Sequence, residues 1–205
     1  MQPVLQQEPW KYDPKSIDMP WRETRYLEGK TGKKVFGVIA TDGIFGFDGT
    51  IMPHPPILRG IQQVITALRK AGHIVVQWQP YKHKYAADLI EKIFSADGAA
   101  PAKRIIASTP HSAVKHDDYK YYGYTEVINL LDWPATTIPV TFTDKEKDIK
   151  NMQYKCMNDL DKETYEAYDP DIYDGGPVGI QLVGKRLQEE YLLGLTEQIG
   201  EALVA

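Results

Sequence analysis

The 205-residue sequence is poor in several features on which common functional sites depend. Its only cysteine, Cys156, excludes an intrachain disulfide and a zinc site built from cysteines. It has no apolar run long enough to span a bilayer, and none near the N-terminus that could serve as a signal peptide. We therefore expect a cytoplasmic protein with no membrane partner.

Long runs of charge of one sign are also lacking. The sequence holds 28 acidic and 24 basic residues, for a formal net charge of −4. Without a basic stripe, no nucleic-acid partner is expected on electrostatic grounds. The length and the 42% hydrophobic content fit a globular protein with one substantial core.

Serine is scarce, with only Ser16, Ser95, Ser108 and Ser112 present. A serine hydrolase needs a serine held near a base and near donors that stabilise an oxyanion. None of the four lies in a Gly-x-Ser-x-Gly turn or in any glycine-rich turn. Residues 108–112 place two hydroxyls beside His111, but hydroxyls that satisfy a turn are the simpler interpretation.

No metal or cofactor site is predicted. His111 and the His-Asp-Asp run at residues 116–118 match no recognised ligand spacing, so a solvated turn is favoured. The glycines of residues 43–49 lack both the Gly-x-Gly-x-x-Gly order and a closing Gly-Lys-Ser/Thr, which argues against a nucleotide-binding loop. Tyr122 and Tyr124 belong to a tyrosine-rich segment that either lines a pocket or packs a loop, and packing is the simpler interpretation.

The apolar pattern predicts an α/β fold. The first half alternates expected strands at residues 35–41, 72–80 and 103–111 with expected helices at residues 57–70 and 85–98. Pro55 and Pro56 suit the start of the first of these helices, and Gly72 suits its end. This alternation is typical of a layered fold around a largely buried sheet.

The second half predicts a helix at residues 125–131 with Thr125 as its cap, and a strand at residues 135–142. Pro139 within that strand indicates an edge or a bulge. The remaining segments are an irregular N-terminal arm at 1–34, a solvated polar excursion at 143–174 with one helical turn near 160–168, a strand at 175–186 and an amphipathic helix at 187–204. We thus divide the chain into the arm and one domain at 35–205.

Several segments carry a family resemblance. The run GGPVGIQLVGKRLQEEYLLGL at residues 175–195 resembles the last strand and helix of amidase-signature enzymes, in which Pro-x-Gly-x-Gln-Leu-Val-Gly precedes a Glu-Glu pair. The Pro-Trp-Arg at 20–22, the His-Pro-Pro at 54–56 and the segment at 121–140 are similar to the acetamidase-like branch known best from fungi. The resemblance implies part of a mixed-sheet, helix-covered amidase-signature fold that is truncated.

The same resemblance implies which residues are missing. Family members hydrolyse carboxamides with a lysine and two serines that belong to a segment before the Pro-Trp-Arg, and no serine pair exists in this sequence. An abrupt junction near residues 100–104 further indicates an internal deletion. We therefore predict no catalytic residue here, and name Ser108, His111, Tyr122 and Tyr124 as candidates for a substrate pocket.

Three functions remain open from the sequence. The first is a catalytically incomplete amidase homologue that meets a small amide substrate only when complemented by a full-length amidase. The second is a binding or regulatory module that associates with such an amidase or with itself as a homo-oligomer. The third is a hydrolase that uses Ser108 or Ser112 with His111.

Overall fold

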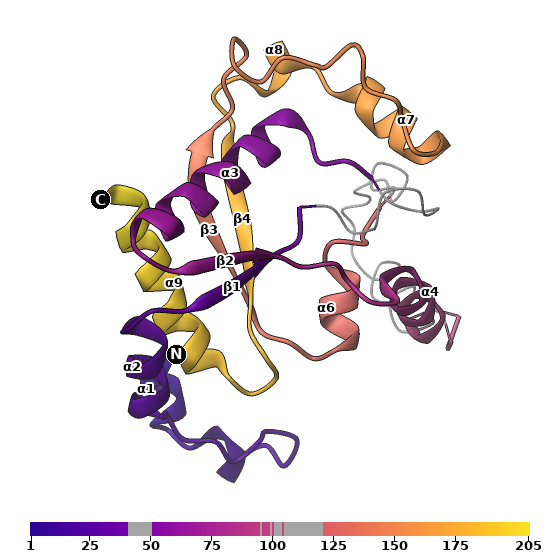
Figure 1. Ribbon diagram of the computed structural model, residues 1–205. Coiled ribbons are helices and arrows are strands. Elements are labelled where there is room, and N and C mark those ends of the chain that lie inside the picture. The colour runs from indigo at the N-terminus through magenta and orange to yellow at the C-terminus, as the bar shows by residue number, and fades with distance from the viewer. Residues whose placement is uncertain (41–50, 95, 99, 101–103, 105–120) are drawn as a thin grey trace.

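The computed structural model describes residues 1–40, 51–94, 96–98, 100, 104 and 121–205 (Figure 1). Within them, two separate pairs of strands form the sheets. β1 (Val35–Val38) pairs in parallel with β2 (Ile74–Gln77), and β3 (Ala135–Phe142) pairs antiparallel with β4 (Pro177–Val183). The fold is thus α/β as predicted, but the described strands form two sheets. Of the strand expected at residues 103–111, only residue 104 is described, and it is helical; the other residues lie outside the described part of the chain.

Helix α3 (Pro55–Lys70) connects the two parallel strands. Two prolines occupy its first turn, where their missing N–H groups cost no hydrogen bond. It ends at Lys70, and Gly72 follows with a φ of 84°, a left-handed conformation that glycine adopts without strain. Both predicted ends of this helix are therefore confirmed.

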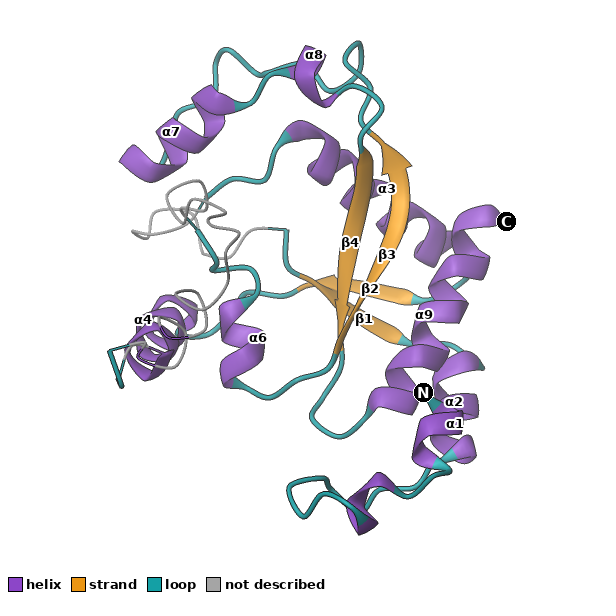
Figure 2. Cartoon of the chain, turned by 180° about the vertical axis from the view of Figure 1, so that it is seen from behind, coloured by secondary structure: helices purple, strands orange, loops and turns teal. Residues whose placement is uncertain are grey.

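The core lies between α3, both sheets and α9 (Glu189–Val204), as Figure 2 shows from behind. One face of each element supplies it, and its buried members are Phe36, Val64, Leu68, Ile138, Leu195 and Ile199. The predicted last strand and last helix are thus confirmed as β4 and α9. The predicted bulge is confirmed as well, because the β3–β4 register shifts between Pro139 and Thr141.

The N-terminal arm is not irregular throughout, contrary to our prediction. It contains α1 (Gln2–Leu5), the short 3-10 helix η1 (Pro9–Lys11) and α2 (Glu23–Lys30). α2 packs tightly along α9, where Gly29 faces Tyr191 and Gly194 faces Tyr26. This helix could not be predicted from the sequence, because its stability comes from the contact with α9 rather than from an amphipathic pattern of its own.

Helices α4 (His83–Phe94) and α6 (Glu126–Leu130) pack together beside the sheets. Thr125 occupies the predicted cap position, but its side chain does not cap the helix; its hydroxyl donates to the carbonyl of Tyr122 at 3.1 Å. The described helices include none that is both long and apolar enough to cross a bilayer.

The excursion at residues 143–174 carries α7 (Asp159–Ala167) and α8 (Pro170–Tyr173). The expected helical turn is confirmed by α7, but the segment is not simply solvated. Asp148 and Asp161 are fully buried, as is most of Tyr168. Buried carboxylates require partners, and these partners, described next, tie the excursion to the rest of the domain.

Candidate functional site

The tyrosine segment before α6 contacts the loop that leads into α3. The hydroxyl of Tyr124 donates to the carbonyl of Ile51, and its ring meets the ring of Tyr121 edge to face, with centroids 6.0 Å apart. Tyr122 is more exposed, and its carbonyl accepts from the N–H groups of Thr125 and Glu126 at the start of α6. The other two pocket candidates, Ser108 and His111, lie outside the described residues.

A carboxylate from α7 holds the same loop from the other side. Asp161 accepts from the N–H of Met52 at 2.9 Å, from the hydroxyl of Tyr154 at 2.7 Å and from the N–H of Met157 at 2.8 Å. Burial and the bond to Asp161 raise the pKa of Tyr154, so this phenol stays protonated as a donor. The residues just before α3 are thereby fixed between α6 and α7.

His54 is the last residue of the loop before α3, and we call residues 51–54 of this loop the 51–54 segment. Its ring stacks on Tyr168 at 4.7 Å between centroids and 19° between planes. Its buried Nδ1 has no hydrogen-bond partner in the described part of the chain. Burial, and then the positive charge of Lys150, lower the pKa of His54, so the imidazole is neutral at pH 7. A neutral buried imidazole can accept or donate a proton, although none of the hydroxyls described in contact with this segment belongs to a serine.

Glu126 is a buried titratable group that the sequence did not indicate. It lies at the first position of α6, and the packing of α4 against α6 buries it almost completely. Burial, and then the negative charges of Glu91 and Asp88 on α4, raise the pKa of its carboxyl. Acidic residues are common in the first turn of helices, so nothing in the sequence marked this one as buried. A carboxyl with a raised pKa is a candidate proton donor.

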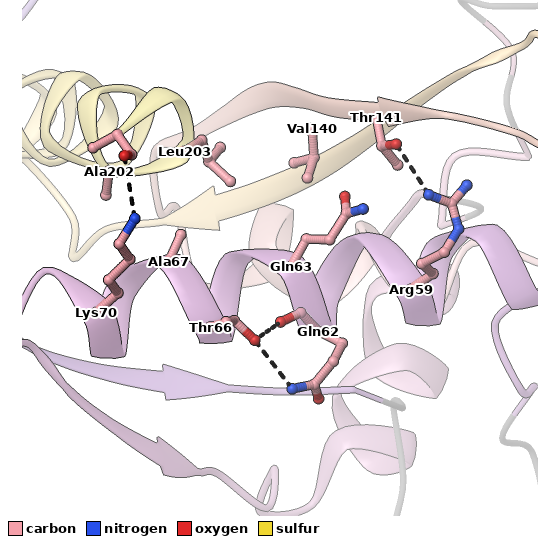
Figure 3. A pocket seen from close by; sticks show the side chains of 11 residues that line it. Arg59, Gln62, Gln63, Thr66, Ala67, Lys70, Val140, Thr141, Ala202 and Leu203 are labelled. Carbon is pink, nitrogen blue, oxygen red and sulfur yellow. Dashed lines mark hydrogen bonds between the residues drawn. The ribbon is translucent and has the colours of Figure 1, made fainter.

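An open groove of about 540 Å³ lies between α3, β3 and the end of α9 (Figure 3). Its two cationic groups are already engaged. Arg59 makes a bidentate bond to Asp148 at 2.7 Å for each contact, and Lys70 donates to the main-chain oxygen of Ala205 at 3.2 Å. A second, smaller groove lies where Arg59 meets the end of β3. Neither groove is lined by Tyr122 or Tyr124. We therefore assign both grooves to the surface rather than to a site.

The described residues bring together no serine nucleophile and base. Of the four serines only Ser16 is described, and it lies in a turn of the arm, where its N–H donates to the carbonyl of Asp13. Nor do these residues include a group of three or more histidine, cysteine or acidic side chains placed to hold a metal ion.

Two motifs of the family resemblance meet in space. The guanidinium of Arg22, from the Pro-Trp-Arg segment, donates to the carboxylate of Glu190, from the Glu-Glu pair, and to the carbonyl of Leu187 at 2.6 Å. The N–H of Arg22 donates to the same carboxylate at 3.2 Å. Burial acts to raise the pKa of Glu190, but these bonds lower it below its usual value. The motifs thus share a structural role, which is to attach the arm to α9.

Comparison with known proteins identifies the family. The sequence matches the Amidase family model over residues 1–108 and 104–193. It is 37% identical to an acetamidase of Emericella nidulans over 261 positions, which cover 98% of this chain and 47% of that protein. It is 34% identical to an acetamidase of Aspergillus oryzae over 264 positions, covering 99% of this chain and 48% of that protein. The chain therefore spans about half the length of these relatives.

The fold agrees with this assignment. A fatty acid amide hydrolase superimposes with a TM-score of 0.80 and 23% sequence identity, over 98% of this chain and 44% of the other. The described helices and strands therefore have the arrangement of part of the amidase-signature fold. By sequence and by fold, the chain belongs to the amidase family and is a homologue of the fungal acetamidases.

Proposed function

We propose that this chain is the part of an acetamidase-like carboxamide hydrolase that shapes the substrate pocket, and that it is inert without the part that carries the nucleophile. The observation that supports this most directly is its set of serines. Hydrolysis in this family, as the resemblance implies, uses two serines and a lysine, whereas the four serines here form no adjacent pair. Without an activated hydroxyl and oxyanion donors, amide cleavage loses its two largest contributions.

The chain also lacks a stretch that its relatives have. The alignment with the Emericella acetamidase is 261 positions long, which exceeds the 205 residues of this chain. The family match is split into two segments that meet at residues 104–108. Both observations support an internal deletion near residues 100–104. Such a deletion removes chain beside the pocket candidates Ser108 and His111, which would alter the pocket even in a complemented enzyme.

The described residues support a role as one wall of the pocket. The 51–54 segment is held rigidly by Tyr124 and Asp161, and rigid walls orient a substrate at low entropic cost. Tyr122 is exposed and precedes Tyr124 by two residues, and phenols and backbone groups suit a small neutral carboxamide. We assign the wall to Tyr122, Tyr124 and the 51–54 segment.

Ammonia release tests the proposal. The purified chain and the Emericella acetamidase would each be incubated with acetamide, benzamide and longer carboxamides, and separately with a fluorophosphonate that labels activated serines. We expect turnover and labelling of the acetamidase only. Turnover by this chain above the blank, with label mapped to Ser108 or Ser112, would instead establish a hydrolase with a relocated nucleophile.

A binding or regulatory module is the second candidate. It is favoured by one specific observation, which is a set of apolar side chains left exposed on the β1–β2 pair.

A further inference from the structure

The excursion at residues 143–174 is attached to the start of α3 by a stack of three rings. The ring of Tyr168 lies next to those of His54 and Tyr173, with centroids 4.7 Å and 5.8 Å away and interplanar angles of 19° and 15°. Tyr168 is only 2% exposed, and its hydroxyl donates to the carbonyl of Asp148 at 2.9 Å. Because Tyr168 is held by its own segment, the stack is the contact through which His54 joins the excursion.

Two polar contacts attach the excursion to the same stretch of chain. The carboxylate of Asp161 accepts from the N–H of Met52 at 2.9 Å, and that of Asp148 accepts from the guanidinium of Arg59 on α3 at 2.7 Å. The bond from Arg59 lowers the pKa of Asp148, so this pair stays charged in mild acid. An imidazole, by contrast, ordinarily titrates between pH 5 and pH 8, as a rough range.

The surroundings of the His54 imidazole suit its neutral form. Its buried Nδ1 has no hydrogen-bond partner in the described part of the chain, so a proton there would be a buried donor without an acceptor. Asp161 acts on this ring as an opposite charge. Its two oxygens, however, already accept three hydrogen bonds, which leaves it poorly placed to bond an imidazolium.

Lys150 of the excursion also opposes a proton on His54. It acts on the imidazole as a like charge, and its Nζ is held by the carbonyl of Glu166 at 2.9 Å. A cation stacked on a phenol gains some attraction from the ring. Burial without an acceptor and the charge of Lys150 act against that gain, and together they lower the pKa of His54 from 6.5.

The other titratable groups around the stack leave this balance unchanged. Arg59 and Asp148 bond to each other and act on Tyr168 with opposite effect. Asp169 also acts on Tyr168, while its carboxylate accepts from the N–H of Asp171 at 3.0 Å. On the side of α6, the 51–54 segment meets the phenol of a tyrosine rather than a charge. Within the described part of the chain, Asp161 is thus the one carboxylate that favours a proton on the imidazole.

We propose that His54 makes the attachment of the excursion sensitive to acid: protonation of its imidazole breaks the stack on Tyr168 and releases the excursion from the 51–54 segment. The attached state is fully stable above pH 6.5, the ordinary value for histidine, and loses stability as the pH falls from there toward the lower folded pKa. Opening should rise by up to about tenfold per pH unit in that window. The inference goes beyond the proposed function, since it holds whether or not the 51–54 segment lines a pocket.

Hydrogen exchange of the full chain near pH 7.5 and near pH 5.5, corrected for the intrinsic pH dependence of exchange, tests the proposal. The measured quantity is the protection of the amides of residues 159–168, with residues 192–203 of α9 as an internal reference. His54→Phe keeps a ring for the stack but cannot be protonated. His83→Phe is the matched control, because His83 is also partly buried but bonds elsewhere, to the carbonyl of Gly123 at 2.7 Å.

We expect the protection of residues 159–168 to fall roughly threefold to tenfold at the lower pH in the wild type and in His83→Phe, and by less than about twofold in His54→Phe. α9 should stay better protected than this segment at both pH values, because the release is local. Lys150→Met removes the like charge but keeps the aliphatic stem, so it should reduce the fall. This variant carries the test if His54→Phe does not fold.

Equal falls in the wild type and His54→Phe would overturn the proposal, as would a fall that His83→Phe abolishes. Greater protection of residues 159–168 in acid would overturn it too, since it would mean that the stack on Tyr168 stabilises the imidazolium. If α9 and residues 159–168 show the same protection and the same fall, the effect belongs to global unfolding, and local release is refuted. A fall in Lys150→Met as large as in the wild type would contradict the part assigned to that charge.

Discussion

The contact between α2 and α9 rests on two glycines, and replacing Gly194 with alanine tests it directly. A Cβ on Gly194 would lie 2.2 Å from the carbonyl oxygen of Tyr26, 2.7 Å from the N–H nitrogen of Lys30 and 3.0 Å from the carbonyl carbon of Gly29. All three are backbone atoms, so no side-chain rotation can relieve the overlap. The two helices would have to separate.

The size of the effect follows from two opposing contributions. Forcing an extra methyl group into a packed contact costs about 1–3 kcal/mol, and the upper end applies because backbone atoms must move. Alanine is favoured over glycine within a helix by up to about 1 kcal/mol. We therefore expect Gly194→Ala to destabilise the contact by roughly 2 kcal/mol.

Gly200 in the same helix is the matched control, because a Cβ there would have no described neighbour within 4 Å. Gly200→Ala should stabilise the protein by about 0.5–1 kcal/mol, which is the helix preference alone. Urea denaturation measures the global change. Hydrogen exchange of the amides of residues 23–30 measures local release of α2, since a short helix can detach without global unfolding.

A result in which Gly194→Ala is as stable as Gly200→Ala, with unchanged exchange in residues 23–30, would refute the close packing of the two helices. Faster exchange in those residues with an unchanged urea midpoint would show that the arm detaches first and that the contact stabilises α2 alone.

Three further predictions concern buried titratable groups. Glu190→Gln removes the carboxylate charge that holds Arg22 and should lower the free energy of unfolding by about 2 kcal/mol at pH 7. Because the folded pKa of Glu190 is lowered, the wild type loses this advantage as the pH falls through that pKa, and the urea midpoints of variant and wild type should converge. Glu126→Gln should raise the urea midpoint at pH 7 and leave it unchanged near pH 3. The folded pKa of Glu126 is raised, so the wild type loses stability as the pH rises above the usual glutamate pKa near 4.5, and the uncharged variant does not. His54→Phe keeps the stack on Tyr168 but removes a group whose folded pKa is lowered from 6.5. Wild-type stability should therefore fall as the pH drops below 6.5, the variant should fall less, and parallel pH profiles in thermal melts would contradict the burial of this imidazole.

Local signals in the sequence predicted the elements whose stability is local. α3 starts at the two prolines before Ile57 and ends just before the glycine after Ala71. The sequence indicates both ends because the effects of these residues on φ and on backbone hydrogen bonding do not depend on distant residues. The apolar spacing of β4 and α9 was strong enough to identify both, and the ordered motif at residues 177–190 also indicated the family.

Signals that depend on distant partners were missed. Asp148 and Asp161 belong to a segment whose composition is that of a solvated loop, and their burial depends on donors that Arg59 and Met52 supply from elsewhere in the chain. The raised pKa of Glu126 likewise arises from a helix more than thirty residues earlier. No pattern within a short window of sequence records such pairings.

The sequence by itself determined that this chain is an α/β member of the amidase family with no adjacent serines, because motifs, composition and helix ends are properties of neighbouring residues. The tertiary structure alone decided that α2 of the arm packs on α9 and that the 51–54 segment is fixed from two sides. The physical reason is that burial and hydrogen-bond satisfaction are set by which surfaces meet. Segments more than a hundred residues apart, such as Arg22 and Glu190, meet only when the chain is folded.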